Sequence, residues 1–189
     1  DLQQLEFDGL TISNLLRVVD PFLLVDHVLW RRDIRTAQGK LNITNDIWFY
    51  SCHFTDGGMM PGVLQTEVML QTIVTCICHD YSATAKNCLI NKSSVNFFEK
   101  IQGAGLISVN AQIGHETKGL IAAKATLKFR GKKTAIGSFR FIAESFNMPV
   151  DQVVKWFIII IVLVFDPVAV ALVLAYNIMV GGKMTLGEE

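Results

Sequence analysis

The chain has 189 residues, 51% of them hydrophobic, and its 17 basic residues balance 17 acidic ones. This length allows one substantial hydrophobic core with an appendage, but a second full domain would be cramped. The chain has no net positive charge and no run of Lys and Arg interleaved with aromatic residues, which argues against a nucleic-acid partner. Four cysteines without a CxxC pair, and a polar start without a signal core, favour free thiols in a reducing, cytoplasmic compartment.

The first part of the chain predicts a short helix followed by a hairpin. Residues 10–18 favour a short helix capped by Ser13 or Asn14, and Pro21 ends it. Residues 22–30 and 36–43 follow as two extended segments separated by charged residues. These two segments are expected to pair as a short hairpin.

A long helix and a run of strands make up the rest of the predicted domain. From Pro61 to about His79, apolar residues surround the predicted helix on nearly all sides, so it must be buried. The segments that alternate apolar and polar residues are 105–113, 120–129 and 134–143, with a further strand at 94–98. The expected class is α+β, a curved antiparallel sheet wrapped around one buried helix, which is the hot-dog fold.

The segment from His53 to Glu67 carries the chemistry. It places an imidazole before a glycine-rich turn, a proline that opens the helix, and a carboxylate two turns into that helix. A lone histidine or glutamate is usually a solvated surface residue. Glu67, however, lies in a helix too apolar to have a solvated face, and burying a carboxylate without purpose is costly. The segment therefore predicts an acid and a base of an enzyme site.

Several short motifs together resemble one enzyme family. They are Pro21-Phe22-Leu23-Leu24-Val25-Asp26, His53-Phe54, and Met60-Pro61-Gly62-Val63-Leu64 with Glu67 and Gln71. In order and spacing, over roughly residues 10–145, they resemble the 3-hydroxyacyl-[acyl-carrier-protein] dehydratases of fatty acid synthesis. Residues 48–54 are also similar to the dehydratase domains of polyketide and polyunsaturated fatty acid synthases.

The resemblance implies an activity and its partners. The expected reaction converts a 3-hydroxyacyl thioester, carried by acyl carrier protein or coenzyme A, into the trans-2-enoyl thioester. The family implies no metal and no organic cofactor. It also implies a homodimer, or a higher oligomer of dimers, in which His53 of one chain faces Glu67 of the other.

Each step of this reaction needs a group that the motif supplies. His53 is expected to remove the proton from C2, and the N–H of Gly62 at the helix start to stabilise charge on the thioester oxygen. Glu67, when protonated, would donate to the departing hydroxyl. Gln71 is one turn beyond Glu67 and is expected to hold it or a water molecule in place.

Some residues depart from the family pattern, and two alternatives remain open. Cys52 stands where the family usually has Gly, and we expect it to be a small buried filler. Glu67 is typical of the branch that only dehydrates, whereas the branch that also isomerises the double bond typically has Asp. The alternatives are a hot-dog acyl-thioesterase, which would use a carboxylate to activate water, and a non-catalytic acyl-binding module.

The last part of the chain differs from the rest in composition. The hot-dog domain is expected to cover residues 1–146 and an apolar tail residues 147–189, with a membrane-associated segment at 156–180. A central Asp costs about 2.5–3.5 kcal/mol on membrane insertion scales, and Pro167 would kink a spanning helix. Two short apolar pieces joined at Asp166-Pro167, or a fusion of unrelated reading frames, are the alternatives for the tail.

Overall fold

The computed structural model describes residues 4–54, 56–82, 85, 88–117 and 119–143, and of residues 142 and 143 only the backbone. The elements in chain order are β1 (Gln4–Asp8), α1 (Gly9–Leu16), β2 (His27–Arg31), β3 (Thr36–Ile43), the short 3-10 helix η1 (Trp48–Tyr50), α2 (Gly62–Asp80), β4 (Cys88–Phe97), β5 (Gly105–Ile113), β6 (Leu120–Phe129) and β7 (Lys132–Ala143).

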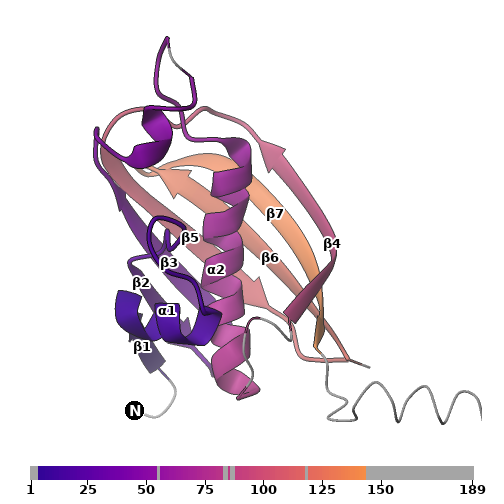
Figure 1. The fold of residues 1–189 in the computed structure, drawn as a ribbon. Coiled ribbons are helices and arrows are strands. Elements are labelled where there is room, and N and C mark those ends of the chain that lie inside the picture. The colour runs from indigo at the N-terminus through magenta and orange to yellow at the C-terminus, as the bar shows by residue number, and fades with distance from the viewer. Residues whose placement is uncertain (1–3, 55, 83–84, 86–87, 118, 144–189) are drawn as a thin grey trace, which may run out of the picture. The chain divides into compact units, whose positions relative to one another are not determined.

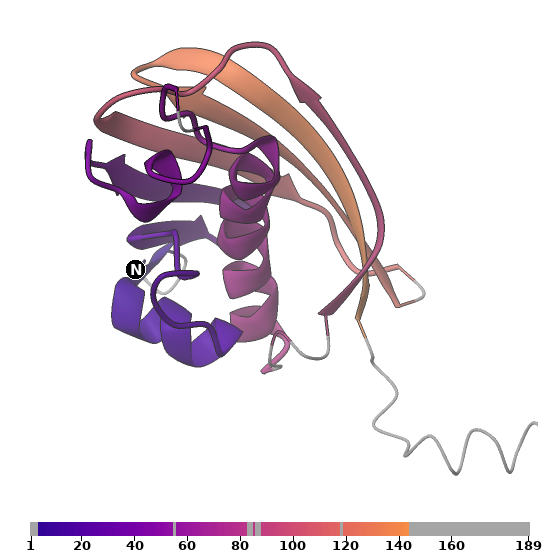
Figure 2. The same ribbon diagram turned by 45° about the horizontal axis from the view of Figure 1, so that its top comes forward.

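The strands form one antiparallel sheet in the order β1-β2-β3-β5-β6-β7-β4. The sheet is strongly curved, and α2 lies along its concave side (Figure 1). A turned view shows β4 and β7 bending around the helix, with α1 lying beside its C-terminal half (Figure 2). This confirms the predicted α+β hot-dog fold, because a single helix is enclosed by a curved antiparallel sheet.

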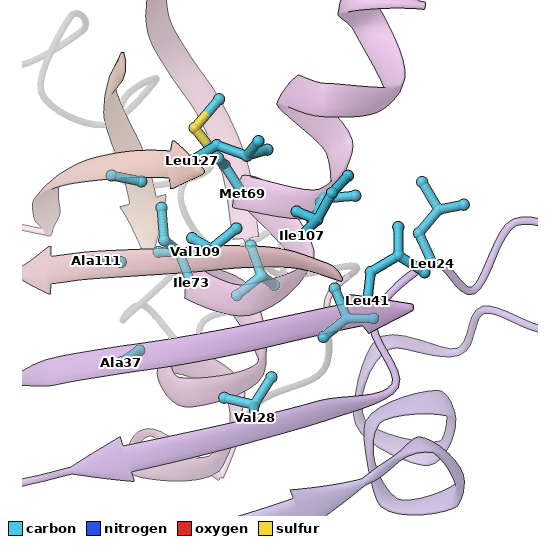
Figure 3. Packing of buried hydrophobic residues seen from close by; sticks show 14 of the residues in the cluster. Leu24, Val28, Ala37, Leu41, Met69, Ile73, Ile107, Val109, Ala111 and Leu127 are labelled. Atoms are coloured by element: carbon cyan, nitrogen blue, oxygen red, sulfur yellow. The ribbon is translucent and has the colours of Figure 1, made fainter. Parts of the chain in front are cut away.

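The helix α2 is buried because most of its side chains face other elements rather than water. Twelve of its 19 residues are buried. Met69 and Ile73 of α2 pack among the inward-facing side chains of the sheet, including Val28, Val109 and Leu127 (Figure 3). The buried hydroxyls of Thr72 and Thr75 donate to carbonyls one turn earlier, which removes the cost of burying them.

A charged cluster fastens the C-terminal end of α2 to the turn between β2 and β3. The buried carboxylate of Asp80 lies 3.0 Å from the Arg32 guanidinium and 3.5 Å from that of Arg35. It also accepts a hydrogen bond of 3.2 Å from the indole N–H of Trp30. Because the charge of Asp80 is paired and hydrogen-bonded, its burial fixes the helix end without leaving a lone charge.

The structure corrects several details of the sequence prediction. Asp8, and not Ser13 or Asn14, caps α1, since its carboxylate accepts from the N–H of Thr11 at 2.8 Å. The strand β1 was not predicted, because a five-residue segment at the start of a chain gives little periodic signal. Strand β4 begins six residues before the predicted 94–98 segment. Its residues are almost all exposed, so it lacks the alternation that predicts strands.

The tail lies outside the described residues. The chain divides into two compact units, Asp1–Ser145 and Phe146–Glu189, and the expectations for residues 147–189 concern the second one. Among the described residues, no helix combines the length and the apolar character needed to cross a membrane.

Gly39 allows β3 to pack closely against Thr72 of α2. A Cβ atom at this position would overlap the Thr72 hydroxyl and lie 3.1 Å from its Cβ. Strand β3 and helix α2 are packed against each other, so neither can move away to make room for the added methyl group. We therefore expect Gly39→Ala to lower the free energy of unfolding by about 1–3 kcal/mol. Urea unfolding measures this loss. The control is Gly9→Ala, whose added methyl makes only an ordinary contact of 3.8 Å. Equal unfolding midpoints for the two variants would contradict the prediction.

Candidate active site

The loop between η1 and α2 holds the imidazole of His53 in one orientation. This loop lies beyond the N-terminal end of α2 (Figure 1). The backbone of His53 bonds to Phe49 and to Met59, and its ring Nδ1 lies 3.0 Å from the carbonyl oxygen of Met59. A carbonyl oxygen only accepts, so Nδ1 carries the hydrogen and donates it. In the neutral ring Nε2 is then unprotonated, which is the form that a base requires.

A hollow of about 370 Å³ lies at the N-terminal end of α2. Its lining includes Met59, whose carbonyl holds His53, and Gly62, the first residue of the helix. The N–H groups of a first helical turn have no partner within the helix, and the helix dipole adds partial positive charge there. A Cβ at Gly62 would lie 3.2 Å from the ring of Phe97, so glycine allows this close packing.

Glu67 lies in a second, smaller cavity of about 140 Å³. Gln71 Nε2 donates to Glu67 Oε1 at 2.9 Å and to the carbonyl of Phe22 at 2.8 Å. Gln71 Oε1 accepts from the N–H groups of Leu24 and Val25 at 2.9 and 3.3 Å. The buried amide therefore fixes the Glu67 carboxyl and ties α2 to the segment before β2. The other residues lining the cavity are mostly apolar: Leu16, Val18, Leu70, Val74, Ala85, Cys88 and Ile90.

Within one chain the structure does not bring His53 and Glu67 together. In the described part of the chain, neither a hydrogen bond nor an ion pair joins these two side chains. The hollow beside Gly62 and the cavity of Glu67 have no lining residue in common. On a helix, five residues advance about 7.5 Å and turn about 140°, so Gly62 and Glu67 emerge on different sides. Within one chain, His53 and Glu67 thus belong to two separate places.

Comparison with known proteins identifies the family. A family model described as the FabA-like domain matches residues 18–136, which is more than half of the chain. The chain belongs to this family. The matched residues include the motifs that resemble those of the dehydratases, so the predicted family resemblance is confirmed.

Relatives and a solved structure extend this result. The FabA-like chain is 29% identical over 143 residues to a 3-hydroxyacyl-[acyl-carrier-protein] dehydratase FabZ from Caldicellulosiruptor saccharolyticus, covering 71% of this chain and 97% of the relative. It is 28% identical to the FabZ of Caldanaerobacter subterraneus, covering 65% and 87%. The structure resembles the dehydratase heterocomplex ApeI:P from Xenorhabdus doucetiae, with a TM-score of 0.59, 11% identity, and coverage of 75% and 96%. This last likeness supports the fold.

The cysteines of the FabA-like chain differ from expectation at one position. Cys52 is exposed and not a buried filler, and its thiol donates to backbone carbonyls of η1. Cys76 is buried, and desolvation raises the pKa of its thiol far above the usual value. Cys76 therefore stays protonated, and its side chain packs in the hydrophobic core.

One further residue lines the hollow beside Gly62, and its sequence position did not indicate this. Gln65 lines the hollow beside Gly62 and is buried, yet its Oε1 has no hydrogen-bond partner among the described residues. The available signal was a polar residue one turn beyond Gly62, directly after the apolar Val63 and Leu64. The spacing alone does not reveal that it lacks a partner.

Proposed function

We propose that this protein catalyses the reversible dehydration of 3-hydroxyacyl thioesters to trans-2-enoyl thioesters. The observation that carries the proposal is the fixed tautomer of His53, whose Nδ1–H donates to Met59 and leaves Nε2 free as a base. Membership of the FabA-like family and the FabZ relatives support the same reaction.

The proposed mechanism uses three groups. His53 Nε2 takes the proton from C2, and the electrons of that C–H bond form the C2–C3 double bond. The C3–O bond breaks, and the hydroxyl leaves as water with a proton from Glu67. The thioester oxygen gains negative charge during the step, and the N–H of Gly62 stabilises it at the helix N-terminus. Gln71 keeps the Glu67 carboxyl in place through its 2.9 Å hydrogen bond.

The proposed active unit is a homodimer. His53 and Glu67 of one chain lie apart, so the proposed complete site uses His53 of one subunit and Glu67 of the partner subunit. The edge strand β4 supports this assembly, because it exposes apolar side chains of Leu89, Ile90 and Phe97. An exposed apolar edge strand is a template for pairing with another chain. The proposed carrier of the substrate is acyl carrier protein or coenzyme A.

The direct test is hydration of a trans-2-enoyl thioester, followed as loss of the enoyl absorbance. We expect the wild-type protein to hydrate crotonyl-coenzyme A. Release of free thiol without hydration would indicate an acyl-thioesterase instead. Binding without either reaction would indicate a non-catalytic acyl-binding module.

A membrane role for residues 156–180 is a separate proposal, based on the apolar sequence of the tail. We expect the full chain to sediment with phospholipid vesicles. Replacing Leu163 and Leu172 together by Lys should move it to the supernatant, because charged residues are costly in the bilayer core. Recovery of the wild type in the supernatant would contradict the proposal.

A further inference from the structure

Two glutamines of α2 have opposite hydrogen-bonding states. Gln71 is 2% exposed, and both ends of its amide are paired with the backbone or with Glu67. Gln65 is 4% exposed, and its side chain makes no hydrogen bond to any described residue; its buried Oε1 is left without a partner. The structure thus contains one saturated and one unsatisfied amide on the same helix.

An unpaired amide in this position needs an explanation. A buried polar atom without a partner destabilises a protein, and buried polar atoms in native structures are nearly always paired. An apolar side chain of similar size at position 65 would avoid this penalty. The partner of Gln65 is therefore expected to come from outside the chain.

The surroundings of Gln65 indicate which ligand supplies that partner. Gln65 follows Gly62 by three residues, so it lies about 4.5 Å further along the helix and on nearly the same side. Both residues line the same hollow of about 370 Å³. Apart from Glu99 and Lys100, the other walls are the mostly apolar Met59, Met60, Phe97 and Phe98. Such a hollow suits an apolar ligand that carries one polar group close to its thioester.

We infer that the Gln65 amide binds the 3-hydroxyl group of the acyl chain while the thioester oxygen lies at the N–H of Gly62. This inference rests on the proposed function. A hydroxyl both donates and accepts, so it pairs with whichever end of the amide turns toward it. Gln65 is then a substrate-binding residue that selects hydroxylated acyl chains, because a chain without the hydroxyl leaves the amide unpaired.

The test compares two ligands in two variants of the full chain. Gln65→Leu and, as the matched control, Gln71→Leu are made in the Glu67→Gln background, which slows turnover during the measurement. Calorimetry then gives the Kd of 3-hydroxybutyryl-coenzyme A and of butyryl-coenzyme A. We expect Gln65→Leu to weaken binding of the hydroxylated ligand about tenfold or more and to change binding of the other less than about twofold.

Thermal unfolding supplies a second readout that separates binding from structure. Without ligand, Gln65→Leu should unfold at the same temperature as its parent or higher, because it removes an unpaired polar group. Gln71→Leu should unfold at a lower temperature, because it leaves backbone partners near Leu24 unpaired.

Three results would overturn the inference. Equal weakening of both ligands would place Gln65 on the carrier arm, and unchanged binding of both would remove it from the site. A lower unfolding temperature or a lost dimer would make Gln65 a structural residue. These results differ from failure of the proposed function, which is the inability of the wild type to hydrate crotonyl-coenzyme A.

Discussion

Replacing His53 by Ala is expected to reduce the rate of enoyl hydration by about 10²–10⁴-fold, the range that general acid–base groups contribute. The variant loses the imidazole whose Nδ1 is bonded to the carbonyl of Met59, a residue that lines the hollow at Gly62. The backbone hydrogen bonds of residue 53 to Phe49 and Met59 do not involve the ring, so the loop should keep its form. Steady-state hydration of crotonyl-coenzyme A measures the loss, and circular dichroism measures the fold.

His115→Ala is the control for this experiment. His115 is exposed in the connection between β5 and β6, so its removal should leave the hydration rate unchanged. A His53→Ala protein that is folded and as active as the His115→Ala protein would exclude His53 as the base. The dehydratase mechanism would then need another proton acceptor.

Strands β3, β5 and β6, whose two faces have different surroundings, were predicted with correct bounds. β5 and β6 alternate buried and exposed side chains along most of their length and are flanked by glycine-containing turns. The edge strands β1 and β4 were missed or shortened. One face of an interior strand is buried by α2. In contrast, β4 is exposed along almost its whole length, so its apolar and polar residues do not alternate.

In the candidate site, too, contacts set by spacing along a helix were predictable, whereas contacts that depend on a loop or on distant residues were not. The bond between Glu67 and Gln71 follows from their spacing of four residues on a helix, and sequence alone suggested it. The bond from His53 to the Met59 carbonyl depends on the path of a loop, which no periodic pattern describes. The unpaired amide of Gln65 depends on what is absent around it, and a sequence does not specify that.

The second large effect is expected for Glu67→Gln, with an activity loss of about 10²–10⁴-fold. The amide oxygen of the new residue still accepts from Gln71, so the hydrogen bond and the fold should remain, while the transferable proton is lost. The matched control is Glu6→Gln on the exposed face of β1, which should retain wild-type activity. Equal activities of the two variants would exclude Glu67 as the acid.

Combining the two inactive variants tests whether one site uses two chains. A purified mixed dimer of His53→Ala and Glu67→Gln subunits, isolated with two different tags, contains one site with an intact His53 and an intact Glu67 if the site is shared. It should recover about half of the wild-type activity. If each chain held a complete site, both sites of this dimer would stay inactive.

A second mixed dimer gives the opposite pattern and completes the test. It pairs a wild-type subunit with a subunit carrying both His53→Ala and Glu67→Gln. With shared sites, each site receives one mutated residue, so this dimer should be inactive even though one subunit is wild type. With a complete site in each chain, it would keep about half of the activity. With shared sites only the first mixed dimer is active, and with a complete site in each chain only the second is active. Misfolding of one variant therefore cannot produce the result expected for shared sites.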